Sequence, residues 1–174
     1  ELLDRDGKVE AFAVGVPKGK SVPNYHSAFI VRPNSEIRLL KDVRNTSIAL
    51  GNKLSISGYN IPMRELLDVG IDSDNGSAFK SIIYVENHDD AIRAVLDCRV
   101  DVAPVSSINL MEMVTSGTIN LNSFRIIHRS SDIPGAPLVY SCDLDNEFKR
   151  RLKELVLGAH ENIEVGGLME RYVD

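Results

Sequence analysis

The sequence predicts an α/β fold with a mostly parallel sheet and helices on both of its faces. From residue 46 to residue 128, short apolar runs alternate with segments of helical periodicity. Gly70 and Gly117 stand where two of the helical patterns stop, as expected for residues that close helices. Because strands that alternate with helices are usually parallel, this order favours a doubly covered parallel sheet.

The individual elements follow from period and from the residues at their ends. The chain ahead of residue 25 contains one strand, a Pro/Gly-rich break and a turn signal at Asp6-Gly7, and we expect a hairpin and a linker there. The expected strands are Val9–Val16, Tyr25–Val31, Thr46–Leu50, Phe79–Val85, Val100–Val105, Phe124–His128 and Leu138–Ser141. The expected helices are Tyr59–Val69, Asp89–Asp97, one from Ser106 and Ser107 to Gly117, and one around Phe148–Val156, with a helical turn near Leu39–Val43.

A turn of small residues, Gly51–Tyr59, joins an apolar strand to a helical pattern. The backbone N–H groups at the start of a helix lack partners within the helix and carry the positive end of its dipole, so they suit an oxyanion. Ser55 and Ser57 would add two hydroxyl donors. The alternative is that these serines only cap the helix.

Two further polar loops follow predicted strands, at Glu86–Asp89 and Ser106–Asn109. Ligands of open α/β sheets gather at the carboxyl ends of the strands. If the three strands lie side by side, three helix starts converge there. His88 in the second loop can then reach an anion held by Ser57, and its protonation would strengthen the contact. The alternative for His88 is a capping residue that faces water.

Composition excludes several other functions. The 174 residues carry a formal charge of -5, which argues against a general nucleic-acid or membrane-surface role. No apolar run approaches the roughly 20 residues of a membrane span. Cys98 and Cys142 lack metal-like spacing, and we expect two buried thiols, with a disulfide as the alternative. We expect no metal and no cofactor.

Several motifs together resemble the phosphonate-binding periplasmic components of ABC transporters. They are Tyr25–Arg32 (YHSAFIVR), the Gly51–Tyr59 turn, His88-Asp89 with Ala91, Val100–Ala103 (VDVA) and Ile133–Pro137 (IPGAP). The resemblance implies the two-lobed type 2 periplasmic binding protein fold, with a phosphonate, phosphate or phosphite group held between the lobes. It also implies ligand contacts from Tyr25, Ser55, Ser57 and His88, with backbone donors from Ile56 to Gly58. Ser106, in the third polar loop, is a further candidate for ligand binding.

Two departures from the family pattern concern the ligand. The turn reads Ser-Ile-Ser-Gly where the family usually has Ser-Thr-Ser-Gly, so Ile56 removes one hydroxyl. The turn after Val105 offers Ser106 and Ser107 where an amine-bearing phosphonate would need carboxylates, which favours ligands without an amine.

A third departure concerns length, because only 24 residues precede Tyr25 where family members carry a first lobe. We therefore expect a processed protein or a piece of one, with the first lobe largely missing. The expected parts are a remnant hairpin and linker at 1–24, the second substrate-binding lobe at 25–137, and a return crossover with C-terminal helices at 138–174.

The expected function is that of an extracytoplasmic solute-binding protein, periplasmic or anchored to the outside of a membrane. It would bind a phosphonate-like oxyanion and deliver it to the permease of an ABC transporter. The alternative is a ligand-sensing domain of the same fold in a signalling or regulatory protein. A phosphoryl-transfer enzyme is not expected, because Lys53 precedes the serines and no acidic cluster offers a magnesium site.

Overall fold

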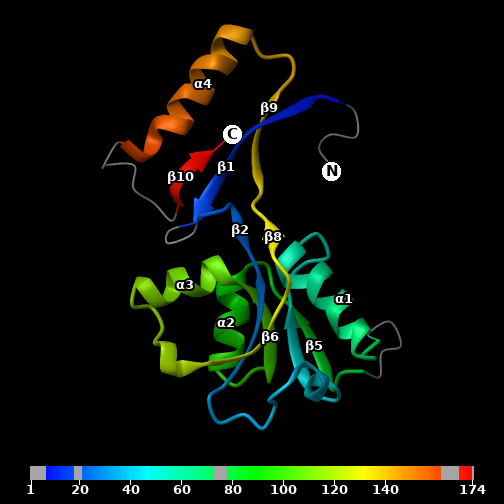
Figure 1. The fold of residues 1–174 in the computed structure, drawn as a ribbon. Coiled ribbons are helices and arrows are strands. Elements are labelled where there is room, and N and C mark those ends of the chain that lie inside the picture. Colours follow the sequence, from blue (N-terminus) through cyan, green and yellow to red (C-terminus); the bar gives the residue numbers. More distant parts are fainter. Residues whose placement is uncertain (1–6, 18–20, 73–77, 162–168, 174) are drawn as a thin grey trace. The chain divides into compact units, whose positions relative to one another are not determined.

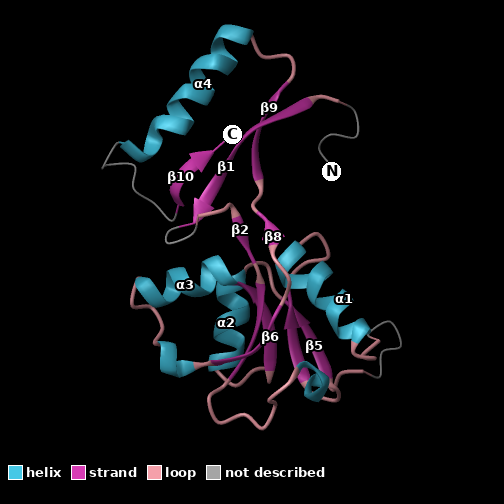
Figure 2. Ribbon diagram, viewed as in Figure 1, coloured by secondary structure: helices cyan, strands magenta, loops and turns pink. Residues whose placement is uncertain are grey.

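Five short runs rich in β-branched and other apolar residues form one sheet in the computed structural model of the chain (Figures 1 and 2). The structure describes residues 7–17, 21–72, 78–161 and 169–173. Along the sheet the order is β5-β4-β6-β3-β7. The strands are β3 (Ser27–Val31), β4 (Ser47–Leu50), β5 (Ser81–Tyr84), β6 (Val102–Ser106) and β7 (Arg125–Arg129).

The sheet is mixed, because β3 runs against its four companions. β4 pairs in parallel with β5 and with β6, whereas β3 is antiparallel to both β6 and β7. Ser27, the first residue of β3, pairs with Ser106, the last of β6. The chain thus enters this sheet at the end where the other strands finish, which we call the carboxyl end. Four of the five strands run in the same direction, as expected for a mostly parallel sheet. Two of the four strand pairings are nevertheless antiparallel, because both involve β3.

Helices cover both faces of the sheet, as the sequence predicts. Successive residues of β3 point to opposite faces, so Ala28 and Ile30 join one buried cluster while Phe29 and Val31 join the other. The first cluster includes residues of α2 (His88–Leu96) and α3 (Ser107–Thr115). The second includes residues of α1 (Ile61–Asp68) and of the short helix η1 (Leu40–Val43). Figure 1 shows α1 across the sheet from α2 and α3.

Local chemistry explains where these helices begin and end. The Asn87 side chain accepts a hydrogen bond from the Asp90 N–H, which caps α2. Pro62 lies in the first turn of α1, where its missing N–H removes no helical bond. Gly70 and Gly117 follow α1 and α3 with φ of 81° and 75°, a region that favours glycine. The helix ends predicted at Gly70 and Gly117 are confirmed within a few positions.

A second sheet has the order β10-β1-β9, with β1 (Val9–Pro17) in the centre. Its outer strands are β9 (Pro137–Ser141) and β10 (Met169–Val173). Both sides of β1 pair with strands from the end of the chain. The first arm of the expected hairpin, ahead of the Asp6-Gly7 turn, lies outside the described residues. The β10 segment, Met-Glu-Arg-Tyr-Val, lacks the alternation of a half-buried strand and was expected to belong to the C-terminal helices.

Helix α4 (Asn146–Gly158) and η4 (Ala159–Glu161) complete the part of the chain that holds β1. Phe12 stacks on Tyr140 with ring centroids 4.7 Å apart, and the Lys149 ammonium lies 5.1 Å above the Tyr140 ring. Lys149 also donates to the Cys142 carbonyl at 2.9 Å. The aromatic pair and this lysine therefore attach α4 to β1 and β9.

The chain divides into two compact units, residues 1–25 with 134–174 and residues 26–133. The strands β2 (Asn24–Tyr25) and β8 (Ile133–Pro134), which pair, lie where the chain passes from one unit to the other. Within the described ranges, no helix is long and apolar enough to cross a bilayer.

Both cysteines are exposed free thiols, so the expected burial was wrong. Cys98 lies in the turn after α2 with φ of 60°, and Cys142 directly follows the outer strand β9. Both cysteines lie outside the packed faces of the sheets. The apolar pattern of the sequence marks residues on those faces, so it did not indicate that these two thiols are exposed.

Asp101 is expected to make the larger unit sensitive to acid. Its carboxylate accepts hydrogen bonds from the Ser47 N–H and hydroxyl, at 3.0 and 2.6 Å, and from Arg32 at 3.1 Å. Burial alone would raise the pKa of this carboxyl, but the bonds from Ser47 and Arg32 outweigh burial and lower the pKa from its ordinary 3.8.

Because the pKa of Asp101 is lower in the folded chain, its contribution to stability is fully present above pH 3.8. That contribution is lost as the pH falls through the folded value. We therefore expect Asp101→Asn to be less stable than the parent at neutral pH, and the difference to shrink under acid. Urea unfolding of both proteins over a pH series measures this; a difference that does not change with pH would contradict it.

Candidate functional site

Three helices of the larger unit begin at the carboxyl end of its sheet. β4 leads through the serine turn into η2 (Ile56–Asn60) and α1, β5 leads into α2, and β6 leads directly into α3. These strands are neighbours in the order β5-β4-β6. The side-by-side arrangement that the sequence argument required is therefore present, and the three polar loops share one end of the sheet.

The serine turn is held in shape by a cap at Ser55. The Ser55 hydroxyl oxygen accepts a hydrogen bond from the Gly58 N–H at 3.0 Å, and Gly51 donates to the Gly58 carbonyl at 2.9 Å. Ser55 therefore caps η2, as the local alternative proposed. Within the described part of the chain, no hydrogen bond takes up the N–H of Ile56 or Ser57. The cap orders the turn and leaves two backbone donors at the helix start.

The structure places Ser57 and His88 in contact. The Ser57 hydroxyl oxygen lies 3.3 Å from His88 Nε2, and Ser57 is only 3% exposed. On the other side of the ring, His88 Nδ1 accepts a hydrogen bond from the Ser106 N–H at 3.3 Å. One imidazole thus connects the serine turn after β4 with the end of β6.

These contacts fix the charge state and tautomer of His88. A backbone N–H only donates, so Nδ1 must carry a lone pair and the ring hydrogen must be on Nε2. Burial also lowers the pKa of His88, and the charge of Asp89 offsets this only in part. The expectation that protonation of His88 would strengthen its contact with an anion stays a prediction; a proton on Nδ1 would face the Ser106 N–H.

Two serines that were not among the predicted site residues form a chain of hydrogen bonds that ends at the Ser57 carbonyl. The Ser27 hydroxyl donates to the Ser57 carbonyl at 2.7 Å, and the Ser27 N–H donates to the Ser130 hydroxyl oxygen at 2.9 Å. Ser27 is fully buried. The only signal in the sequence was a polar residue at the start of an otherwise apolar strand, Ser-Ala-Phe-Ile-Val.

Glycine is required at position 58 by close packing. A Cβ on Gly58 would lie 2.9 Å from the Ser55 hydroxyl oxygen and 3.2 Å from Cε1 of His88. The same Cβ would lie 3.4 Å from the Gly51 Cα. Gly58 therefore allows the serine turn and the imidazole to approach each other.

The other residues that were predicted to bind the ligand are Ile56, Tyr25 and Ser106. Ile56 begins η2 with a side chain that is 51% exposed. Tyr25 belongs to the smaller unit, on β2, and its expected contact with the ligand stays a prediction. Ser106 is 4% exposed, and its hydroxyl oxygen accepts from the Ile108 N–H at 3.3 Å. His128, outside the predicted site, contacts Glu65 at 2.9 Å and packs against Phe29.

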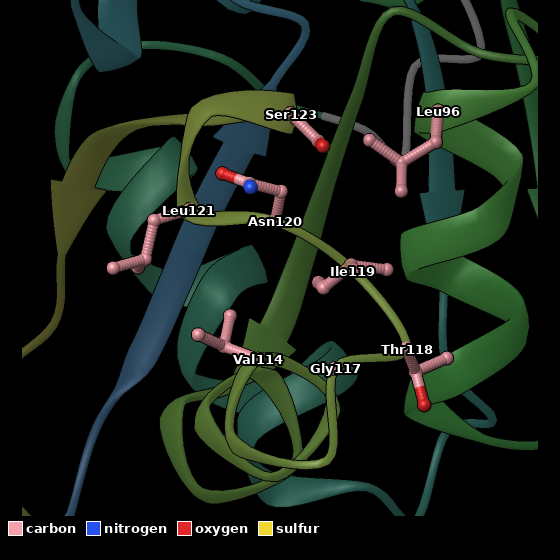
Figure 3. A pocket seen from close by; sticks show the side chains of 8 residues that line it. All are labelled: Leu96, Val114, Gly117, Thr118, Ile119, Asn120, Leu121 and Ser123. Atoms are coloured by element: carbon pink, nitrogen blue, oxygen red, sulfur yellow. The ribbon is translucent and has the colours of Figure 1, made fainter.

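An open hollow of about 510 Å³ lies at the other end of the sheet (Figure 3). Leu96 at the end of α2 and the connection from Gly117 to Ser123, ahead of β7, contribute to its walls. None of the predicted site residues lines it. Among the described residues, no group of three or more His, Cys, Asp or Glu side chains is arranged to hold a metal ion.

Known proteins resemble the chain over most of its length. It is 27% identical over 176 residues to a phosphonates-binding periplasmic protein of Escherichia coli K12, covering 98% of the chain and 50% of that protein. The chain thus spans about half the length of this curated relative.

Solved structures show the same fold. The binding-protein component of a Pseudomonas aeruginosa ABC phosphonate transporter superposes with a TM-score of 0.79 at 24% identity, over 95% of this chain and 57% of that one. PhnD1 of Prochlorococcus marinus, in complex with methylphosphonate, superposes with a TM-score of 0.77 at 16% identity, over 94% and 65%. The fold is that of the type 2 periplasmic binding proteins, as the resemblance implied.

The family model described as "ABC transporter, phosphonate, periplasmic substrate-binding protein" matches residues 1–172. The chain therefore belongs to the phosphonate-binding periplasmic substrate-binding proteins of ABC transporters.

Proposed function

We propose that the chain binds the tetrahedral oxyanion group of a phosphonate and takes part in its delivery to the permease of an ABC transporter. The observation that carries this proposal is the contact of the buried Ser57 hydroxyl with His88, at a place where three helices begin. Phosphate and phosphite present the same tetrahedral oxyanion, and we include them as ligands.

The site attracts an anion although the whole chain is acidic. Helix starts carry partial positive charge, and hydrogen bonds to a charged group contribute about 1.5–3 kcal/mol each. These interactions act over the first turn of a helix, whereas the formal charge of -5 is spread over 174 residues. In the proposal Ser55, Ser57, Ser106, His88 and the N–H groups of Ile56 and Ser57 surround the anion, because the Gly58 N–H already donates to Ser55. Tyr25 is a further proposed ligand contact.

The tautomer of His88 supports binding rather than catalysis. A serine nucleophile needs a base that can remove its proton. His88 Nε2 carries a hydrogen when Nδ1 accepts from Ser106, so it donates to Ser57 and cannot act as that base. We propose that the chain is not an enzyme, and a phosphatase assay with and without magnesium is expected to show no turnover.

The cellular setting follows from the family. Its members are periplasmic transport proteins, so an extracytoplasmic location is implied and the sensing alternative is not favoured. We propose that the partner of the chain is the permease of an ABC transporter. We also propose that the protein can be attached to the outside of a membrane.

Phosphorus NMR of the ligand tests the proposal even at millimolar affinity. Methylphosphonate, phosphate and phosphite lines are expected to broaden when the 174-residue chain is added. Dimethyl methylphosphonate, which keeps the phosphorus–carbon bond but has no charge, serves as the matched control and should not respond. Equal broadening of this neutral diester, or none for any of the anions, would contradict the proposal.

A further inference from the structure

We propose that Ser27 is a positioning residue of the proposed anion site, because its hydroxyl makes a hydrogen bond that the backbone of the serine turn cannot make for itself. Ser27 acts through Ser57 and does not contact the anion. This inference rests on the proposed function. It adds a residue on which the geometry of the site depends and a physical reason for that dependence.

The serine turn continues into a wide helical turn, in which backbone N–H groups donate to carbonyls five residues back. The Ile61 N–H donates to the Ile56 carbonyl, and the N–H before it makes the same kind of bond. In this wide turn the Ser57 carbonyl would accept from residue 62. That residue is Pro62, which has no N–H, so the Ser57 carbonyl has no helical donor.

Ser27 supplies the donor from a different part of the chain. Its hydroxyl donates to the Ser57 carbonyl at 2.7 Å. Ser27 is the first residue of β3, an otherwise apolar strand, and it is fully buried, so its hydroxyl requires a partner. The Ser27 hydroxyl thus takes the place of the N–H that Pro62 lacks.

This bond fixes the peptide group between Ser57 and Gly58. The carbonyl of that peptide accepts from Ser27, and its N–H, on Gly58, donates to the Ser55 hydroxyl oxygen at 3.0 Å. The peptide is planar, so holding it at both ends restrains the rotation of Ser57 about its own backbone. The Ser57 hydroxyl is thereby directed to its place 3.3 Å from His88 Nε2.

Ser27 is itself held in one orientation by Ser130, which directly follows β7. The Ser27 N–H donates to the Ser130 hydroxyl oxygen, and the Ser27 carbonyl accepts from the Ser130 N–H, both at 2.9 Å. The Ser130 hydroxyl in turn donates to the Ser131 carbonyl at 2.7 Å. A side chain that positions a binding group must be fixed by its own surroundings, and Ser27 meets this requirement.

Without the Ser27 hydroxyl, a tighter turn would satisfy the Ser57 carbonyl. The Ile61 N–H would then donate to Ser57, four residues back, as in an α-helix. In that turn the proline would face the Gly58 carbonyl, which already accepts from Gly51 at 2.9 Å. The tighter turn is therefore compatible with the sequence.

The choice between the two turns determines the position of Ser57. A buried carbonyl without a donor is unfavourable, so removal of the Ser27 hydroxyl favours the tighter turn. Because the number of residues per turn differs, the tighter turn rotates Ser57 and moves its hydroxyl away from His88. Ser27 thus holds the serine turn in the form that binds the anion.

Ser27→Ala tests this role by amide NMR titration of the 174-residue chain with methylphosphonate. Apparent affinity falls with the fraction of molecules that have the binding-competent turn, and we expect a loss of about tenfold. Ser47→Ala is the matched control, because the Ser47 hydroxyl also donates within the larger unit, to Asp101 at 2.6 Å, but at the other end of the sheet. It should lower stability and leave methylphosphonate affinity unchanged.

A spectroscopic signature separates positioning from a general loss of stability. In the parent, the scalar coupling across the hydrogen bond of the Ile61 amide should identify the Ile56 carbonyl as its acceptor. In Ser27→Ala the acceptor should become the Ser57 carbonyl, whereas Ser47→Ala should keep the parent pattern. This measurement needs no ligand, so it tests the turn separately from anion binding.

Pro62→Ala provides a rescue, because it returns an N–H to residue 62. In the Ser27→Ala background this N–H can donate to the Ser57 carbonyl within the wide turn, and most of the lost affinity should return. Pro62→Ala alone should bind methylphosphonate like the parent. Losses that simply add in the double variant would overturn the inference.

Two further results would overturn the inference while leaving phosphonate binding intact. One is an unchanged methylphosphonate affinity in Ser27→Ala, and the other is an equal loss in Ser27→Ala and Ser47→Ala. An Ile61 amide that keeps the Ile56 acceptor in Ser27→Ala would also overturn it. A parent chain that does not bind methylphosphonate would contradict the proposed function, and the Ile61 coupling would still decide whether Ser27 sets the turn.

Discussion

Replacing Ser57 with alanine is expected to weaken methylphosphonate binding by about 1.5–3 kcal/mol, the range for a hydrogen bond to a charged group. This corresponds to a loss in affinity of roughly 10- to 150-fold. The Ser57 hydroxyl is buried in contact with His88, and alanine would remove the hydrogen bond that this hydroxyl is proposed to donate to the anion. Amide NMR titration of the variant and the parent measures the change in dissociation constant.

Ser123→Ala is the matched control for this substitution. Ser123 ends the short helix η3 (Leu121–Ser123) and lines the hollow at the other end of the sheet, so its hydroxyl should not affect binding. Equal affinity of the Ser57 variant and the parent would place the anion site elsewhere. Equal losses in both variants would point to a general effect of serine removal on the unit.

Gly58→Ala is expected to destabilise the larger unit by about 1–3 kcal/mol, the usual cost of an extra methyl group in a well-packed place. The new Cβ would lie 2.9 Å from the Ser55 hydroxyl oxygen and 3.2 Å from Cε1 of His88. Moving Ser55 away loses the cap on η2, and moving His88 away loses its contact with Ser57. Binding should therefore weaken together with stability.

Gly158→Ala tests whether the effect at Gly58 comes from packing or from glycine removal in general. A Cβ at Gly158, the last residue of α4, meets no atom within 4 Å. Alanine there is expected to stabilise the chain by about 0.5–1 kcal/mol. Urea unfolding measures both variants; a Gly58→Ala protein as stable as its parent would contradict the packing argument.

Much of the fold follows from the sequence because local signals and tertiary structure agree. The alternation of apolar runs with helical patterns identifies the elements of the larger unit, and Gly70 and Gly117 mark helix ends where they were expected. The reversed direction of β3 is different, since it depends on where the chain enters the sheet. The partners of β1 depend on strands more than a hundred residues away.

The candidate site was only partly visible in the sequence. Helix starts after predicted strands led to Ser55, Ser57, His88 and Ser106, and the structure brings these residues to one end of the sheet. The hydrogen bond from the Ser27 hydroxyl could not be anticipated, because it goes to the carbonyl of Ser57, which lies in the connection after a different strand, β4. The tautomer of His88 depends on one hydrogen bond, which comes from the backbone N–H of Ser106. The position of this N–H is set by the tertiary structure, so it could not be predicted from the sequence.

The most direct test of the central claim is a two-dimensional amide NMR map of the chain titrated with methylphosphonate. The account predicts that the largest shifts occur at the amides of Ser57, Gly58, His88 and Ser106, with little change at Thr118 and Asn120 by the other hollow. Largest shifts at Thr118 and Asn120, with the Ser57 and His88 amides unmoved, would contradict it.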